Sequence, residues 1–130
     1  MPPAETASFC FLGISSAEPD YRLSVMLNKQ LGISLTHGKT INLITAEETS
    51  EYSVFTTNPS FFTLISNKSH GKLLIRSLKN IDFFLVINES SNLARAELIA
   101  AEIRKIPLIT AAFVFYSQEI KDRNIQLLVR

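Results

Sequence analysis

The stretch that decides the fold runs from Leu64 to Glu89 and reads LISNKSHGKLLIRSLKNIDFFLVINE. Two short apolar runs on either side of a polar turn predict two strands, and a short connection then leads to Phe83–Ile87, where every residue is apolar. A strand with one exposed face alternates apolar and polar residues, so an uninterrupted apolar run indicates that both faces are covered. We therefore expect a strand at 82–88 in the middle of a sheet.

Several shorter runs accompany this strand. Between residues 33 and 75 apolar residues recur at every second position, which is the spacing of a strand with one buried face. Segments rich in turn-forming residues separate the runs. The apolar pairs are Ile41/Leu43, Tyr52/Val54, Phe62/Leu64 and Leu73/Ile75. We expect these runs to form an antiparallel meander.

A first helix is predicted over residues 19–31. Pro19 suits the first helical position, and Glu18 and Asp20 place negative charge beside the positive end of the helix dipole. Gly32 follows, where a left-handed residue commonly ends a helix. The inward stripe at helical spacing comprises Leu23, Met26, Leu27 and Leu31.

A second helix is predicted over Leu93–Lys105. Asn92 can cap its start, Arg104 and Lys105 suit its negative end, and Pro107 ends it. Its inward stripe comprises Leu93, Ala96, Ile99, Ala100 and Ile103.

The ends of the chain complete the order of elements. Phe9–Ile14 is predicted to be a first strand that closes at Ser15-Ser16, and Ile109–Tyr116 a last strand. Residues 1–7 are expected to be a loose end. Residues 117–130 are expected to be a C-terminal extension, and we interpret its apolar tail, Ile125–Val129, as an added edge strand.

This order predicts a single α+β domain over residues 1–130. Two helices can bury their apolar stripes by lying on one face of a mostly antiparallel sheet, a layout related to the split βαβ, ferredoxin-like plan with extra meander strands. A fold of this kind does not name a function.

Composition limits the class of protein. The chain of 130 residues is 46% hydrophobic and 19% charged, as expected for an ordered domain. Its formal net charge of +1 provides no overall field toward nucleic acid or an anionic membrane. One cysteine, Cys10, cannot form an intramolecular disulfide, and no apolar run reaches the length of a membrane span. We expect a cytoplasmic protein without a membrane or nucleic-acid partner.

Several stretches, in the same order along most of the chain, carry a family resemblance. They are Asp20-Tyr21-Arg22-Leu23 with Leu27-Asn28, Ser66-Asn67-Lys68-Ser69 with Gly71, Leu74-Ile75, Lys79-Asn80-Ile81-Asp82-Phe83-Phe84-Leu85 and Ile106-Pro107. In these the chain resembles the IPExxVD (IPExxVDY) family of small bacterial proteins, named for an Ile-Pro-Glu that shortly precedes a Val/Ile-Asp-aromatic triplet. The sequence departs from that pattern at Arg76-Ser77, which replace the Pro-Glu. The resemblance implies a small cytoplasmic α+β protein and supplies no catalytic residues.

Four polar residues are candidates for a ligand site: Ser15, Ser16, Asp20 and Asp82. Asp82 directly precedes the doubly covered strand, so it could contact a ligand or metal at a sheet edge. The favoured alternative is structural, with the carboxylate bonded to nearby backbone N–H groups or to a lysine. For Asp20, interaction with the start of the first helix is likewise the favoured explanation.

Motifs for enzyme chemistry are missing from the sequence. The two histidines, His37 and His70, lie beside glycines in predicted loops, and Cys10 belongs to an apolar strand, where a buried thiol is more common than a reactive one. No phosphate-binding loop, dinucleotide fingerprint or His-Glu-x-x-His pattern occurs. We therefore assign no catalytic residue, metal or cofactor. An enzyme whose site consists of a carboxylate with a His or Tyr remains an alternative, because such a site leaves no local motif.

Two kinds of binding module share features with this sequence. Phe113-Val114-Phe115-Tyr116 resembles part of an RNA-recognition signature, but the preceding Thr110-Ala111-Ala112 lacks its basic residue, glycine and leading aromatic. A regulatory module of the ACT-like kind would hold a small molecule where Ser15–Asp20 joins strand to helix.

The favoured interpretation is a non-catalytic binding or interaction domain. Nine phenylalanines present more aromatic surface than the two predicted helices can cover. This predicts a homodimer that forms through a strand edge or an aromatic surface.

Overall fold

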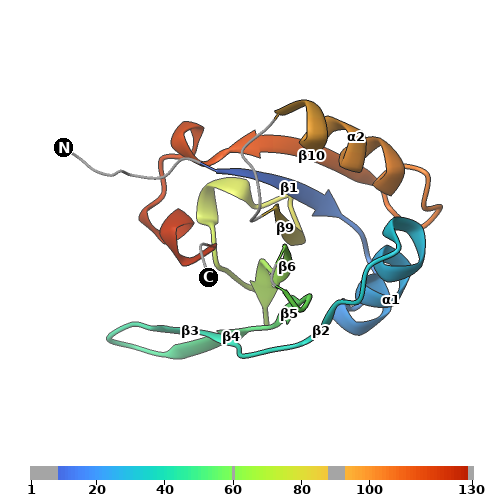
Figure 1. Ribbon diagram of the computed structural model, residues 1–130. Coiled ribbons are helices and arrows are strands. Elements are labelled where there is room, and N and C mark those ends of the chain that lie inside the picture. The colour runs from blue at the N-terminus through green and yellow to red at the C-terminus, as the bar shows by residue number, and fades with distance from the viewer. Residues whose placement is uncertain (1–8, 60, 88–92, 129–130) are drawn as a thin grey trace.

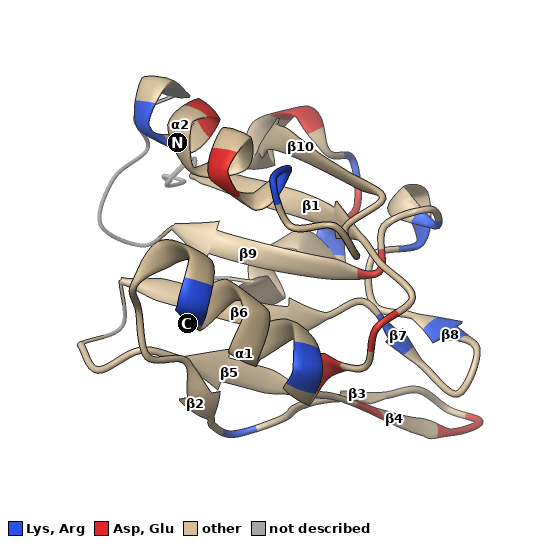
Figure 2. Ribbon diagram, turned by 90° about the vertical axis from the view of Figure 1, so that its right-hand side faces the viewer, with Lys and Arg blue, Asp and Glu red and all other residues tan. Residues whose placement is uncertain are grey.

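The computed structural model describes residues 9–59, 61–87 and 93–128, and its largest element is a six-stranded antiparallel sheet. The strands follow one another in the order β10-β1-β9-β6-β5-β2, as Figure 2 shows from β10 at the top to β2 at the bottom. Their bounds are β1 Cys10–Ser15, β2 Thr36–His37, β5 Val54–Thr56, β6 Phe62–Ser66, β9 Phe83–Ile87 and β10 Ala111–Tyr116. The α+β class predicted from the sequence is confirmed.

β9 is a central strand with both faces covered, as the apolar run predicts. It pairs with β1 on one side and with β6 on the other, and each of its residues is buried. Phe83, Leu85 and Ile87 face one hydrophobic cluster, whereas Phe84 and Val86 face a second. The sheet therefore separates two cores.

Two helices cover the first core (Figure 1). Helix α1, Asp20–Leu31, buries Leu23 and Leu27, which lie one turn apart. It ends at Gly32, whose φ of 66° is left-handed and whose N–H donates to the Asn28 carbonyl. Pro19 is the N-cap and not the first helical residue, so the helix begins one residue later than predicted.

Helix α2, Leu93–Ile103, buries Ala96, Ala100 and Ile103 against the same core and ends two residues before the predicted end. The predicted cap Asn92 lies outside the described residues. β9, α2 and β10 form a split βαβ unit, because both strands are antiparallel to β1, which lies between them.

The second core is covered by less regular structure. A hairpin of β3 (Ile41–Ile44) and β4 (Thr49–Tyr52), the 3-10 helix η1 (Arg76–Leu78) and the C-terminal 3-10 helix η3 (Arg123–Leu128) surround it. The prediction that the apolar tail forms an edge strand is therefore wrong for the described residues 125–128. Ile125 and Leu128 face the sheet together only in a helical turn, and both are buried there.

The predicted meander is only partly correct. The Tyr52/Val54 run is not one strand, because Ser53 separates β4 from β5 and the two strands belong to different sheets. The Leu73/Ile75 run also lies outside the main sheet. Its first part forms β8 (Lys72–Leu73), which pairs only with β7 (Lys68–Ser69).

Asn67 organises the segment that leads into β9. Its amide donates to the carbonyls of Leu78 (3.0 Å) and Ile81 (2.8 Å), and its side-chain oxygen accepts from the N–H of Ile75 (2.8 Å). Asn67 is completely buried, although it lies in the polar turn predicted between the two apolar runs. The turn itself lies at His70 and Gly71, both of which have positive φ.

Gly13 allows an aromatic ring to cross β1. A Cβ on Gly13 would lie 2.6 Å from a ring atom of Phe115 and 3.1 Å from Ile81. The Phe115 ring can therefore stack on Phe11, with ring centroids 5.4 Å apart. This contact fixes the middle of β10 against the second core.

Candidate functional site

The predicted ligand residues converge where β1 leads into α1. The Asp82 carboxylate accepts the Ser16 N–H at 2.9 Å and forms an ion pair with Lys68 Nζ at 2.6 Å. These contacts are the structural role that the sequence favours for Asp82. They anchor the β1–α1 loop to the entrance of β9.

Ser16, Asp20 and Asp82 line one hollow of about 390 Å³, together with Lys68. Ser15 is not in its lining, and its hydroxyl instead donates to the Asn80 carbonyl at 2.8 Å. The Ser16 hydroxyl donates to the Leu108 carbonyl at 2.9 Å. Asp20 accepts the N–H of Tyr21 at 2.7 Å.

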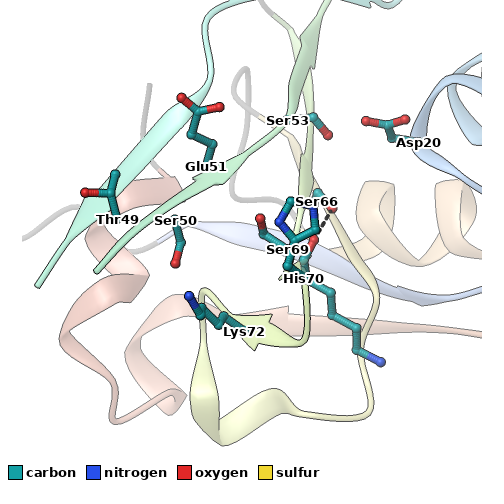
Figure 3. A pocket seen from close by; sticks show the side chains of 10 residues that line it. Asp20, Thr49, Ser50, Glu51, Ser53, Ser66, Ser69, His70 and Lys72 are labelled. Carbon is teal, nitrogen blue, oxygen red and sulfur yellow. Dashed lines mark hydrogen bonds between the residues drawn. The ribbon is translucent and has the colours of Figure 1, made fainter. Parts of the chain in front are cut away.

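A larger hollow of about 650 Å³ adjoins the first and shares Asp20, Ser66 and Lys68 with it. Figure 3 shows Asp20 on one side, Thr49 and Glu51 of β4 on the other, and His70 between them. The remaining lining is polar and consists of Ser50, Ser53, Ser69 and Lys72. Such a surface suits a polar, hydroxyl-bearing molecule better than an apolar one.

The two lysines of this hollow are paired with carboxylates that lie outside its lining. Lys68 is paired with Asp82, and Lys72 with Glu48. The Ser66 hydroxyl donates to the Lys68 carbonyl at 3.2 Å (Figure 3). Within the described part of the chain, no hydrogen bond or ion pair joins His70 to a carboxylate. The hollow thus brings a histidine near two carboxylates without forming a nucleophile and base pair.

Cys10 is buried in β1, as its apolar neighbours predict. Burial raises the pKa of its thiol, and a side-chain hydrogen bond with Tyr116 opposes that effect. The same burial and bond raise the pKa of the Tyr116 hydroxyl. Both groups are therefore neutral at physiological pH, and Cys10 is not a thiolate nucleophile there. His37 lies exposed on β2, far from Cys10 in the strand order, and packs edge-on against Phe55.

The outer edge of β10 is the second candidate site. The Ser117 N–H donates to the Phe9 carbonyl on the β1 side, which makes Phe9 and Ser117 a hydrogen-bonded pair. With the register in which Phe113 opposes Gly13, alternation directs the backbone groups of Ala112, Val114 and Tyr116 away from β1. Among the described residues no strand lies on that outer side.

Side chains cover the two ends of this edge. Arg104 donates to the Ala112 carbonyl through Nε at 2.9 Å and Nη2 at 2.7 Å. At the other end the Glu119 carboxylate accepts the Tyr116 N–H at 3.4 Å. Val114 lies midway, and no described residue hydrogen-bonds to its N–H or carbonyl.

The surface of β10 is apolar as well as open. The strand contains no charged residue (Figure 2), and the Phe113 side chain is 51% exposed. Natural proteins usually protect such an edge with charges, prolines or a covering segment. The sequence favours self-association through a strand edge or an aromatic surface without specifying the strand, and Phe113–Tyr116 resembles part of an RNA-recognition signature. The signal for this edge is an uncharged last strand at the end of the sheet.

No family model matches the chain, and a search of curated proteins finds no match. The described helices are too short or too polar to cross a membrane. In the same residues, no group of three His, Cys, Asp or Glu side chains could hold a metal ion.

Proposed function

We propose that the protein is a non-catalytic interaction domain that associates with a second copy of itself through β10. The observation that carries this proposal is the outward-facing backbone of Ala112, Val114 and Tyr116 on an uncharged edge strand. An added antiparallel strand satisfies such groups with main-chain hydrogen bonds. It also covers the exposed ring of Phe113, which otherwise remains in water.

The variant Val114→Pro tests this proposal. Proline removes the outward N–H, a change that edge strands tolerate because no internal bond is lost. Light scattering across a dilution series should give a dimer for the natural chain and a monomer for V114P, while circular dichroism shows that both are folded. A monomer for the natural chain at every concentration would refute self-association.

Ligand binding of the ACT-like kind is a second candidate. It is supported by the convergence of Ser16, Asp20 and Asp82 around one hollow that continues into the larger polar hollow. A panel of amino acids and hydroxylated metabolites should then raise the melting temperature of the natural chain but not of Asp20→Ala. A panel without any shift would argue against this candidate.

We extend the proposal to the family of the protein and to its compartment in the cell. The motif resemblance supports membership of the IPExxVD family, and the single buried cysteine supports a reducing, cytoplasmic compartment. Fractionation of the source cells with an antibody against the chain tests the location.

A further inference from the structure

We infer that the two copies pair their β10 strands antiparallel about a two-fold axis at Val114, so that Arg104 of each copy meets Glu119 of the other. This inference rests on the proposed self-association and specifies its register. The evidence is the set of backbone groups on the outer edge of β10 and the positions of Arg104 and Glu119 beside it.

The backbone places the axis at Val114. Of the three outward-facing residues, Ala112 has its carbonyl occupied by Arg104, and Tyr116 has its N–H occupied by Glu119. Val114 alone presents both a donor and an acceptor that no described residue engages. When Val114 opposes itself across a two-fold axis, each N–H meets the carbonyl of the other copy.

The charges agree with this axis. Arg104 is held at position 112 and Glu119 at position 116, two residues on either side of Val114. Antiparallel pairing about residue 114 sets position 112 of one copy opposite position 116 of the other. At each end the Tyr116 N–H of one copy then replaces Arg104 on the Ala112 carbonyl of the other copy. The displaced guanidinium and the displaced Glu119 carboxylate pair beside that bond, and shifting the strands by two residues would separate these charges.

The aromatic side chains agree as well. Ala112, Val114 and Tyr116 pack toward the helices, whereas Phe115 packs against the second core. Alternation along the strand places Phe113 on the same face as Phe115. In this register Phe113 of one copy opposes Phe115 of the other at a non-hydrogen-bonded pair, where side chains approach most closely. The half-exposed Phe113 ring thus gains an aromatic neighbour.

Charge reversal tests the register. In R104E two carboxylates meet at each end of the dimer, and in E119R two guanidiniums meet. Each variant alone should dissociate about tenfold more readily than the natural chain, or more. A mixture of R104E and E119R should form a heterodimer, because both ends then pair opposite charges. Native mass spectrometry separates the heterodimer from either homodimer.

A second pair of variants controls for attraction between oppositely charged proteins. K39E and E47R change the net charge by the same amounts, but Lys39 and Glu47 are exposed residues of the β2–β3 and β3–β4 connections, remote from β10 in the strand order. They should remain homodimeric alone and show no preference for the heterodimer when mixed. A preference equal to that of R104E with E119R would overturn the inference.

Cross-linking provides a test that leaves both charges intact. Only residue 114 opposes itself in this register, at a Cα separation of about 5.5 Å that a disulfide can span. In a Cys10→Ala background, mild oxidation should link V114C chains into dimers faster than Q118C chains. If the natural chain is a dimer but neither the mixture nor V114C behaves as described, the register is wrong and self-association stands. If the natural chain is a monomer, the proposed function itself fails.

Discussion

Asp82 fixes the backbone of Ser16, whose N–H lies 2.9 Å from the Asp82 carboxylate although the two residues are 66 positions apart. The other carboxylate oxygen holds Lys68. Three segments, the β1–α1 loop, the entrance of β9 and the start of β7, therefore meet at one side chain. This contact shapes both polar hollows, because Lys68 lines each of them.

Replacing Asp82 should loosen this junction. We expect Asp82→Ala to lower the free energy of unfolding by about 1–3 kcal/mol, since a part-buried N–H and an ammonium lose their acceptor. Asp82→Asn keeps an oxygen for Ser16 and should lose less. Urea denaturation measures both. Equal stability of D82A and the natural chain would show that water replaces the carboxylate at no cost.

Loss of the Asn67 side chain should destabilise the fold more than loss of Asp82, because Asn67 binds backbone groups of three residues in the interior. Asn67→Ala leaves buried donors and acceptors without partners, and we expect a loss of about 2–4 kcal/mol. Asn80→Ala is the matched control, since Asn80 is exposed. Thermal unfolding should leave N80A close to the natural chain, and a similarly small effect of N67A would contradict the role given to Asn67.

Gly13 should not tolerate a side chain. A Cβ there collides with the Phe115 ring, so Gly13→Ala should cost about 1–3 kcal/mol through displacement of that ring. At Gly38 an added Cβ finds only ordinary contacts, the nearest at 3.5 Å, which makes Gly38→Ala the control. Denaturant unfolding of the two variants checks the difference. Equal stability would mean that Phe115 repacks without strain.

Ionisation of the buried Cys10 and the partly buried Tyr116 should weaken the fold at alkaline pH. Burial raises the pKa of both groups in the folded protein above their ordinary values of 9.0 and 10.0. Their neutral forms thus favour the folded state fully below those values, and stability falls as pH rises through the raised pKa values. Unfolding measured from pH 7 upward should show this decline, and Cys10→Ala should reduce it. A thiol that reacts with iodoacetamide as fast as a free cysteine at neutral pH would contradict this account.

Local patterns in the sequence were sufficient for several elements. The unbroken apolar run predicted that β9 is covered on both faces, because a strand without any polar residue has no face suited to water. Helix α1 was predicted within one residue, since Leu23, Leu27 and Gly32 mark its inner face and its end. Ser16 and Asp20 were placed together at the junction of strand and helix, whereas only the fold brings Asp82 to them and directs the Ser15 hydroxyl elsewhere.

Other features depend on contacts that a local pattern does not contain. Ser53 interrupts an alternating run, and only the packing of the two cores determines that the chain changes sheets there. The spacing of Ile125 and Leu128 fits a turn of 3-10 helix, but the apolar tail also suits a strand. Asn67 resembles a turn residue in sequence, because its hydrogen-bond partners lie eight to fourteen positions away. The open edge of β10 appears only when the strand order is known.

The amide proton of Val114 gives the most direct measure of the central claim that β10 pairs with a second copy. We predict slow exchange with deuterium at high protein concentration and progressively faster exchange on dilution, because this N–H has a partner only in the dimer. The Phe113 amide, which faces β1, should stay protected while the fold persists. Fast exchange of Val114 at every concentration, beside a protected Phe113, would contradict the claim.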